Sequence, residues 1–144
     1  MSYRFIEGLT VADVAFEARG KTLEELFASS GLALTAVQVL DPRKVRKRES
    51  RAFDVTSKTA EMLLFNFLQE IIYFKDVDQL LLRDFDLSIR IDSDGTHYLT
   101  GTGRGETIDP ARHHLSADVK AVTMHKFELV RDKKGWKATV VLDI

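Results

Sequence analysis

The sequence predicts an α/β protein of the α+β type, with a mixed, mostly antiparallel β-sheet and two main helices. Two stretches, near residues 23–37 and 57–74, repeat apolar residues at helical spacing, whereas several shorter stretches alternate apolar and polar residues. Tight turns such as Ser93-Asp94-Gly95 join successive strands, which favours antiparallel pairing. Because 144 residues suit one core but not two ordinary domains, we expect a single small domain covering residues 1–144.

The composition excludes several classes of chemistry. Lys and Arg number 21 against 22 Asp and Glu, so no global field attracts nucleic acid or an anionic membrane. The absence of Cys excludes disulfides, zinc thiolates and cysteine nucleophiles. It leaves carboxylates, carbonyls and imidazoles as metal ligands, a set that favours hard cations. Residues 1–5 lack the apolar core of a signal peptide, and no apolar run reaches membrane-spanning length. We therefore expect a cytoplasmic protein with no membrane partner.

The first third of the chain predicts a strand followed by a helix. Residues 12–20 alternate as a half-buried strand does, and Asp13 is unusual near its start unless the carboxylate has a use. Thr22 and Glu25 have the spacing of a capping box, so the helix should begin at residue 23 and end near residue 37. Gly31 in its middle should weaken it by up to about 1 kcal/mol.

The most basic stretch lies between Arg43 and Arg51 and reads RKVRKRESR. One interpretation is a solvated edge strand or loop, the usual role of a charge run. The other is a contact for RNA phosphate or for an acidic protein partner. The stretch contains no interleaved aromatic residues, so it is not typical of a base-stacking surface.

A second, more hydrophobic helix is predicted from about Ser57 to about Phe74, and its apolar stripe should lie at the centre of the core. Glu70 lies close to that stripe and is interpreted as a glutamate at the helix edge. Residues 75–78 are interpreted as a turn.

The second half of the chain predicts strands at 85–91 and 96–102. The glycine-rich stretch 101–106 matches no phosphate-binding loop and is interpreted as a bulged strand end. The adjacent residues His113 and His114 would point opposite ways in an extended chain, so a surface pair is favoured over a chelating pair.

The stretch 118–130 predicts a regular strand with one apolar face, and His125 falls on the face expected to be buried. Lys120 has an apolar residue on each side. The last predicted strand, 136–142, leads to Asp143 and Ile144. Their carboxylates and a backbone carbonyl would gather hard oxygen donors that suit Ca²⁺ or Mg²⁺, provided another carboxylate arrives from elsewhere.

Several stretches together resemble the archease family. They are ADV at 12–14, GKTLEELF at 20–27, VKAVTMH at 119–125 and the final Asp143-Ile144. The leucine-rich helix with Glu70 also fits, as do Glu106 and His113 by type and spacing. The resemblance spans nearly the whole chain in order; the VKAVT-x-H run and the final Asp-Ile are its specific parts.

The resemblance implies a small α/β protein that activates the GTP-dependent RNA ligase of tRNA splicing and is not itself an enzyme. The family promotes guanylylation of that ligase and its repeated turnover, with a bound divalent metal ion involved. The essential residues of the family correspond to Asp13, Lys120 and Asp143, and its metal ligands to Asp13, Asp143 and Ile144. Calcium is the expected ion, with magnesium or manganese as alternatives.

The chain departs from the family pattern at two positions. Thr10 stands where the family commonly has a histidine, which puts the detailed metal ligand set in question. Phe67 replaces a family tryptophan, an exchange that core packing should tolerate.

Two other functions remain open on sequence grounds. A metal-dependent phosphoesterase would use Asp13 and Asp143 with His113 or His125 as general base. A chaperone-like protein would instead modulate a tRNA methyltransferase. The tRNA itself is a further possible partner of the protein.

Overall fold

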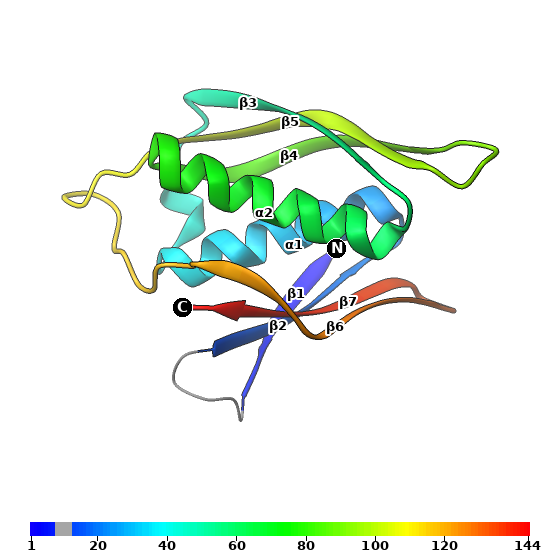
Figure 1. The fold of residues 1–144 in the computed structure, drawn as a ribbon. Helices are drawn as coiled ribbons and strands as arrows, with labels where there is room; N and C mark the ends of the chain where they lie inside the picture. The colour runs from blue at the N-terminus through cyan, green and yellow to red at the C-terminus, as the bar shows by residue number, and fades with distance from the viewer. Residues whose placement is uncertain (8–12) are drawn as a thin grey trace.

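The computed structural model describes residues 1–7 and 13–144, and it shows two β-sheets with two helices between them (Figure 1). The helices are α1 (Leu23–Gln38) and α2 (Ala60–Asp78), and a short 3-10 turn, η1 (Pro42–Lys44), follows α1. The strands are β1 (Ser2–Ile6), β2 (Asp13–Gly20), β3 (Glu49–Ser57), β4 (Leu80–Ile91), β5 (His97–Thr107), β6 (Ala121–Asp132) and β7 (Gly135–Asp143). The predicted α+β class with two main helices is confirmed. Thr10 and Ala12 lie outside the described residues.

The strands form a four-stranded sheet, in the order β1-β2-β7-β6, and a three-stranded sheet, in the order β3-β5-β4. Every strand pair among the described residues is antiparallel. Helix α1 packs on β2 of one sheet and on β4 of the other, so the helices form the middle layer (Figure 1). The division into two sheets, and strand β1, were not predicted from the sequence.

The core lies where the two helices meet both sheets. Its largest fully buried side chains are Phe16, Phe27, Phe67, Leu26, Leu34, Leu63, Leu64, Leu68, Ile71, Leu80, Leu81 and Leu82. Phe67 of α2 is at its centre, with ring centroids 5.6 Å from Phe27 of α1 and 5.0 Å from Phe53 of β3. The predicted apolar stripe of the second helix is therefore confirmed, and phenylalanine packs well at this position.

Helix α1 begins as its sequence predicts. The Thr22 hydroxyl accepts a hydrogen bond from the amide of Glu25 at 3.1 Å, and the Glu25 carboxylate accepts one from the amide of Lys21 at 2.8 Å. A Cβ at Gly31 would lie 2.8 Å from the ring of Phe85. Gly31 thus allows close packing between α1 and β4, which offsets its low helix propensity.

Helix α2 is shifted relative to the prediction. Ser57 is the last residue of β3, and residues 75–78, predicted as a turn, form the last turn of the helix. The helix ends at Asp78, and the next residue, Gln79, caps it with a left-handed φ of 51°. Lys75 explains the extension, because its buried ammonium group donates hydrogen bonds to Asp118 and to the carbonyl of Val119.

The glycine-rich stretch 101–106 forms the second half of β5, the central strand of its sheet, and ends one residue before the strand does. The bulge is in the neighbouring strand β4, between Leu82 and Asp84. A Cβ at Gly105 would lie only 1.7 Å from the carbonyl oxygen of Leu81. Glycine at this position therefore lets the bulged strand approach closely.

The predicted regular strand over 118–130 is wrong in two respects. Strand β6 begins only at Ala121, and its pairing with β7 is irregular between Thr123 and Glu128. Lys126 has a φ of 54° within this irregular stretch, and His125, predicted to be buried, is exposed. The local change of direction breaks the alternation that the sequence pattern implies.

No helix among residues 1–7 and 13–144 combines the length and the hydrophobicity that crossing a membrane requires.

Candidate functional site

Strand register brings the two predicted metal-binding aspartates together. Asp13, the first residue of β2, lies directly opposite Asp143, the last residue of β7. Residues opposite each other in an antiparallel pair point to the same face of the sheet. The next pair, Val14 and Leu142, packs in the core, so both aspartates face away from the helices.

Lys120 and Ile144 lie at the same end of this sheet. The amide of Lys120 donates a hydrogen bond to the carbonyl of Asp143 at 2.8 Å, and the next residue, Ala121, pairs with Asp143. Ile144 packs against the core, whereas Lys120 is exposed. The structure therefore gathers the four residues that the resemblance singles out, from β2, β7 and the segment before β6.

Lys75 fixes the segment that carries Lys120. Its side chain is only 6% exposed, and Nζ lies 2.6 Å from carboxylate oxygens of both Asp118 and Asp76 and 2.7 Å from the carbonyl of Val119. Burial disfavours the charge, but the hydrogen bonds to Asp118 and Asp76 outweigh it and hold the pKa of Lys75 above its ordinary value. The sequence pattern gave no sign of this residue, because Asp118 and Val119, which it holds, lie 43 and 44 residues further along the chain.

The donor set at Asp13 and Asp143 suits a hard divalent cation. Within residues 1–7 and 13–144, no group of three or more His, Asp or Glu side chains is arranged to hold a metal. A cation here would therefore bind two side-chain carboxylates and complete its shell with main-chain oxygens, such as those of Ile144, and water. Ca²⁺ and Mg²⁺ accept such oxygen-rich, partly hydrated shells.

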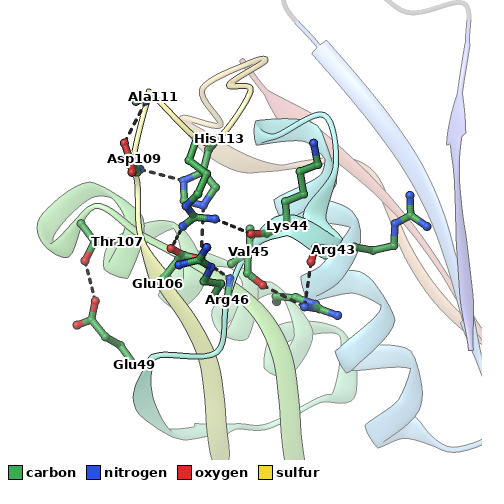
Figure 2. Close-up of polar contacts among 12 residues, drawn as sticks. Arg43, Lys44, Val45, Arg46, Glu49, Glu106, Thr107, Asp109, Ala111 and His113 are labelled. Carbon is green, nitrogen blue, oxygen red and sulfur yellow. Dashed lines mark hydrogen bonds and ion pairs between the residues drawn. The ribbon is translucent and has the colours of Figure 1, made fainter.

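His113 belongs to a different cluster, and its prediction as part of a surface pair is wrong. The imidazole is buried, while His114 is exposed. Its Nδ1 accepts a hydrogen bond from the amide of Asp109 at 2.9 Å, and its Nε2 lies 3.6 Å from a carboxylate oxygen of Glu106 (Figure 2). Burial, together with the positive charge of Arg112, holds the pKa of His113 below its ordinary value of 6.5.

The other two candidate residues, Glu70 and His125, do not join either cluster. Glu70 is half-buried on α2, as expected for a helix-edge glutamate. His125 is exposed in the irregular part of β6. Neither is hydrogen-bonded to Lys120 or Asp143 within the described part of the chain.

Fold and site together define a small α+β protein with two helices between two antiparallel sheets and a pair of aspartates at the end of one sheet. A model of the archease protein family (MTH1598/TM1083) matches residues 3–144. The chain is 37% identical over 134 residues to the protein archease of Pyrococcus furiosus, covering 92% of this chain and 93% of that protein. It is 34% identical over 142 residues to the archease of Methanosarcina mazei, covering 99% and 95%. The chain belongs to the archease family.

Solved structures agree with this assignment. The solution structure of Methanobacterium thermoautotrophicum protein 1598 matches with a TM-score of 0.79 at 33% identity, covering 99% of this chain and 98% of that one. A crystal structure of a Thermotoga maritima archease, described as a possible chaperone, has a TM-score of 0.64 at 19% identity and 98% coverage of both chains. The latter likeness concerns the fold alone.

Proposed function

We propose that the protein acts in the cytoplasm as an activator of the GTP-dependent RNA ligase of tRNA splicing, promoting ligase guanylylation and repeated turnover. The observation that carries the proposal is the register that sets Asp13 opposite Asp143, with Lys120 bonded to the same residue through its amide. Membership of the archease family supports it.

In this proposal Asp13 and Asp143 hold a divalent cation, expected to be Ca²⁺, with Mg²⁺ or Mn²⁺ as alternatives. The bound cation would supply a concentrated positive charge for phosphate oxygens or for carboxylates of the partner. Lys120 adds an exposed ammonium group carried on a segment that Lys75 fixes. The aspartate pair lies on the face of the sheet that points away from the helices, and both residues are half-buried there.

The surroundings of His113 favour activation of a partner over catalysis by the chain itself. The Nδ1 of His113 is already occupied by the amide of Asp109, and its imidazole is enclosed with Glu106 and Arg112. His125 is exposed in the irregular part of β6. A phosphoesterase would need one of these bases hydrogen-bonded to a water or substrate at the aspartates.

The test is multiple-turnover RNA ligation by the cognate ligase, with ligase limiting and this protein added or withheld. Stimulation should be lost in Asp13→Asn and Asp143→Asn and kept in Asp54→Asn, a control that removes an exposed strand aspartate from the other sheet. No stimulation by the folded wild-type protein with an active cognate ligase would contradict the proposal.

A chaperone-like role toward a tRNA methyltransferase is the second candidate, and it rests on membership of the archease family. The two candidates give different results in paired assays. Altered methylation specificity, with ligation unchanged, would favour the chaperone role.

A further inference from the structure

The basic segment between α1 and β3 is held in one conformation by arginines from distant parts of the chain. Arg83 of β4 donates from the same nitrogen to the carbonyls of Arg43 and Val45, each at 3.1 Å. Arg112 donates to the carbonyl of Lys44 at 2.9 Å. Consecutive main-chain carbonyls are therefore bonded inward, which a merely solvated loop does not require (Figure 2).

Apolar packing and main-chain amides complete this anchorage. The side chain of Val45 is fully buried against Val39 and Leu81. The amide of Arg46 donates to the carboxylate of Glu106, and the amide of Arg48 donates to the carbonyl of Gly105 at 2.9 Å. With the main chain held at both positions, Arg46 and Arg48 present exposed side chains from a fixed backbone.

These two arginines, with Arg112, line an open hollow of about 340 Å³ at the end of β5. Its other lining residues are Glu49, Glu106, Thr107, Ile108 and Asp109. We call it the arginine hollow.

The acidic residues of the arginine hollow are already engaged. The buried carboxylate of Glu106 is paired with Arg112, and that of Glu49 accepts from the hydroxyl of Thr107 at 2.7 Å. The carboxylate of Asp109 accepts from the amide of Ala111 at 3.0 Å. Within the described part of the chain, by contrast, the guanidinium groups of Arg46 and Arg48 have no hydrogen bond or ion pair.

The arginines of the hollow also repel one another. Burial, followed by the positive charges of Arg46 and Arg48, lowers the pKa of Arg112 from its ordinary value. An anion between these side chains would relieve that repulsion, because it would add the acceptors that Arg46 and Arg48 lack.

We propose that the arginine hollow binds a phosphate group between Arg46, Arg48 and Arg112. Guanidinium groups bind phosphate oxygens in a forked, two-bonded geometry, and a phosphate offers more oxygens to three arginines than a carboxylate does. None of the described residues that line the hollow is aromatic, so it would contact phosphate rather than stack on bases. The phosphate could be inorganic phosphate or a phosphodiester of an RNA strand.

Binding should be measured with two probes, inorganic phosphate by isothermal titration and a labelled single-stranded oligouridylate by fluorescence anisotropy. The test variant is Arg46→Gln with Arg48→Gln; both side chains are exposed and unbonded, so thermal unfolding should match that of the wild type. The matched control is Lys133→Gln with Lys134→Gln, which removes the same charge from the β6–β7 turn at the other end of the molecule (Figure 1).

We expect the test variant to lose affinity for at least one probe by about tenfold or more, and the control to change it by less than about twofold. Loss for both probes would assign the hollow to phosphate from either source, and loss for oligouridylate alone would assign it to an RNA strand. For the strand, the slope of log affinity against log salt should also fall by about 0.7 for each phosphate contact removed.

Three results would overturn the proposal. The first is that the wild type binds neither probe, and the second is that the test variant and the control lose the same affinity. The third is that an acidic peptide such as oligoglutamate binds as tightly as the phosphate probes. The last would show a general cationic surface that binds acidic proteins. Because Asp13→Asn and Asp143→Asn leave these arginines untouched, they should keep phosphate binding, so this test is independent of the ligase assay.

Discussion

Two sites made of charged side chains, each at the end of one sheet, are built in different ways. The aspartate pair of the four-stranded sheet is placed by strand register alone, since Asp13 and Asp143 are direct neighbours across β2 and β7. The arginine hollow beside the three-stranded sheet is placed by side chains that bond to a loop backbone 38 and 68 residues away in sequence. One site therefore depends on the sheet, and the other on a few long-range polar contacts.

This difference predicts different responses to substitution. Removing a contact that holds the arginine hollow should lower stability, because those side chains bond to main chain and Glu106 among them is buried. Removing an aspartate from the pair should change binding while leaving the fold intact, because the ladder of β2 and β7 does not depend on side-chain carboxylates.

The largest effect is expected from Glu106→Ala. The substitution removes a buried carboxylate that accepts from the amide of Arg46 and pairs with Arg112, and it leaves those donors without a partner. Breaking such a buried pair should cost about 3 kcal/mol in the free energy of unfolding, measured by urea denaturation.

Glu49→Ala is the matched control for Glu106→Ala. Glu49 lines the same hollow, but its side chain is 40% exposed. Its removal should cost no more than about 1 kcal/mol. Equal losses for the two variants would show that Glu106 does not organise the loop.

A smaller loss is expected from Lys75→Met, which keeps most of the side-chain volume but removes the donor to Val119 and the partner of Asp118. The free energy of unfolding should fall by about 2 kcal/mol. Calcium affinity should fall as well, because the segment carrying Lys120 loses its anchor.

The control for this substitution is Lys58→Met, at an exposed lysine just before α2. It should stay within about 0.5 kcal/mol of the wild type. Unchanged calcium affinity in a folded Lys75→Met protein would separate Lys75 from the aspartate site.

Acidification should lower the stability of the protein through the buried imidazole of His113. Because the pKa of His113 is lowered on folding, the unfolded chain takes up a proton first as pH falls below about 6.5. This residue should therefore lower stability by at most about 1.4 kcal/mol per pH unit from pH 6.5 down to its folded pKa.

Denaturation of the wild type and of His113→Gln between pH 7 and 5, repeated at high ionic strength to screen net charge, measures this effect. The wild type should lose more stability than the variant. A wild type that gains stability relative to His113→Gln would show instead that Glu106, 3.6 Å from Nε2, holds a charged imidazolium.

Much of the fold could be predicted from local patterns, because helix periodicity, the Thr22 cap and the hairpin turns are properties of neighbouring residues. The predicted secondary structure is wrong where contacts between residues far apart in sequence determine the local conformation. Residues 75–78 are helical because Lys75 bonds to Asp118, and Leu80, Leu81 and Leu82 join β4 although a continuous apolar run has no alternation. The irregular pairing of β6 near His125 could not be predicted, because apolar and polar residues alternate regularly through this part of the sequence.

The two charged sites differ in the same way. The sequence pattern marks Asp13 and Asp143 only separately, as unusual residues at strand ends; the family resemblance implies that they act together, and the register places them opposite each other. The basic segment was visible in the sequence, but Arg83, Glu106 and Arg112, which hold it, lie far along the chain and have ordinary local patterns. Whether such a segment is a solvated loop or a fixed one is decided by tertiary contacts.

The most direct test of the central claim is the calcium dependence of thermal unfolding for the wild type, Asp143→Asn and Asp54→Asn, each compared with a chelator-treated sample. If the aspartate pair holds the cation, calcium at 100 times its dissociation constant should stabilise the wild type and Asp54→Asn by about 2.7 kcal/mol. Asp143→Asn should unfold normally in chelator but lose most of the calcium response. A full calcium response in Asp143→Asn would contradict the account, because the ion would then bind elsewhere.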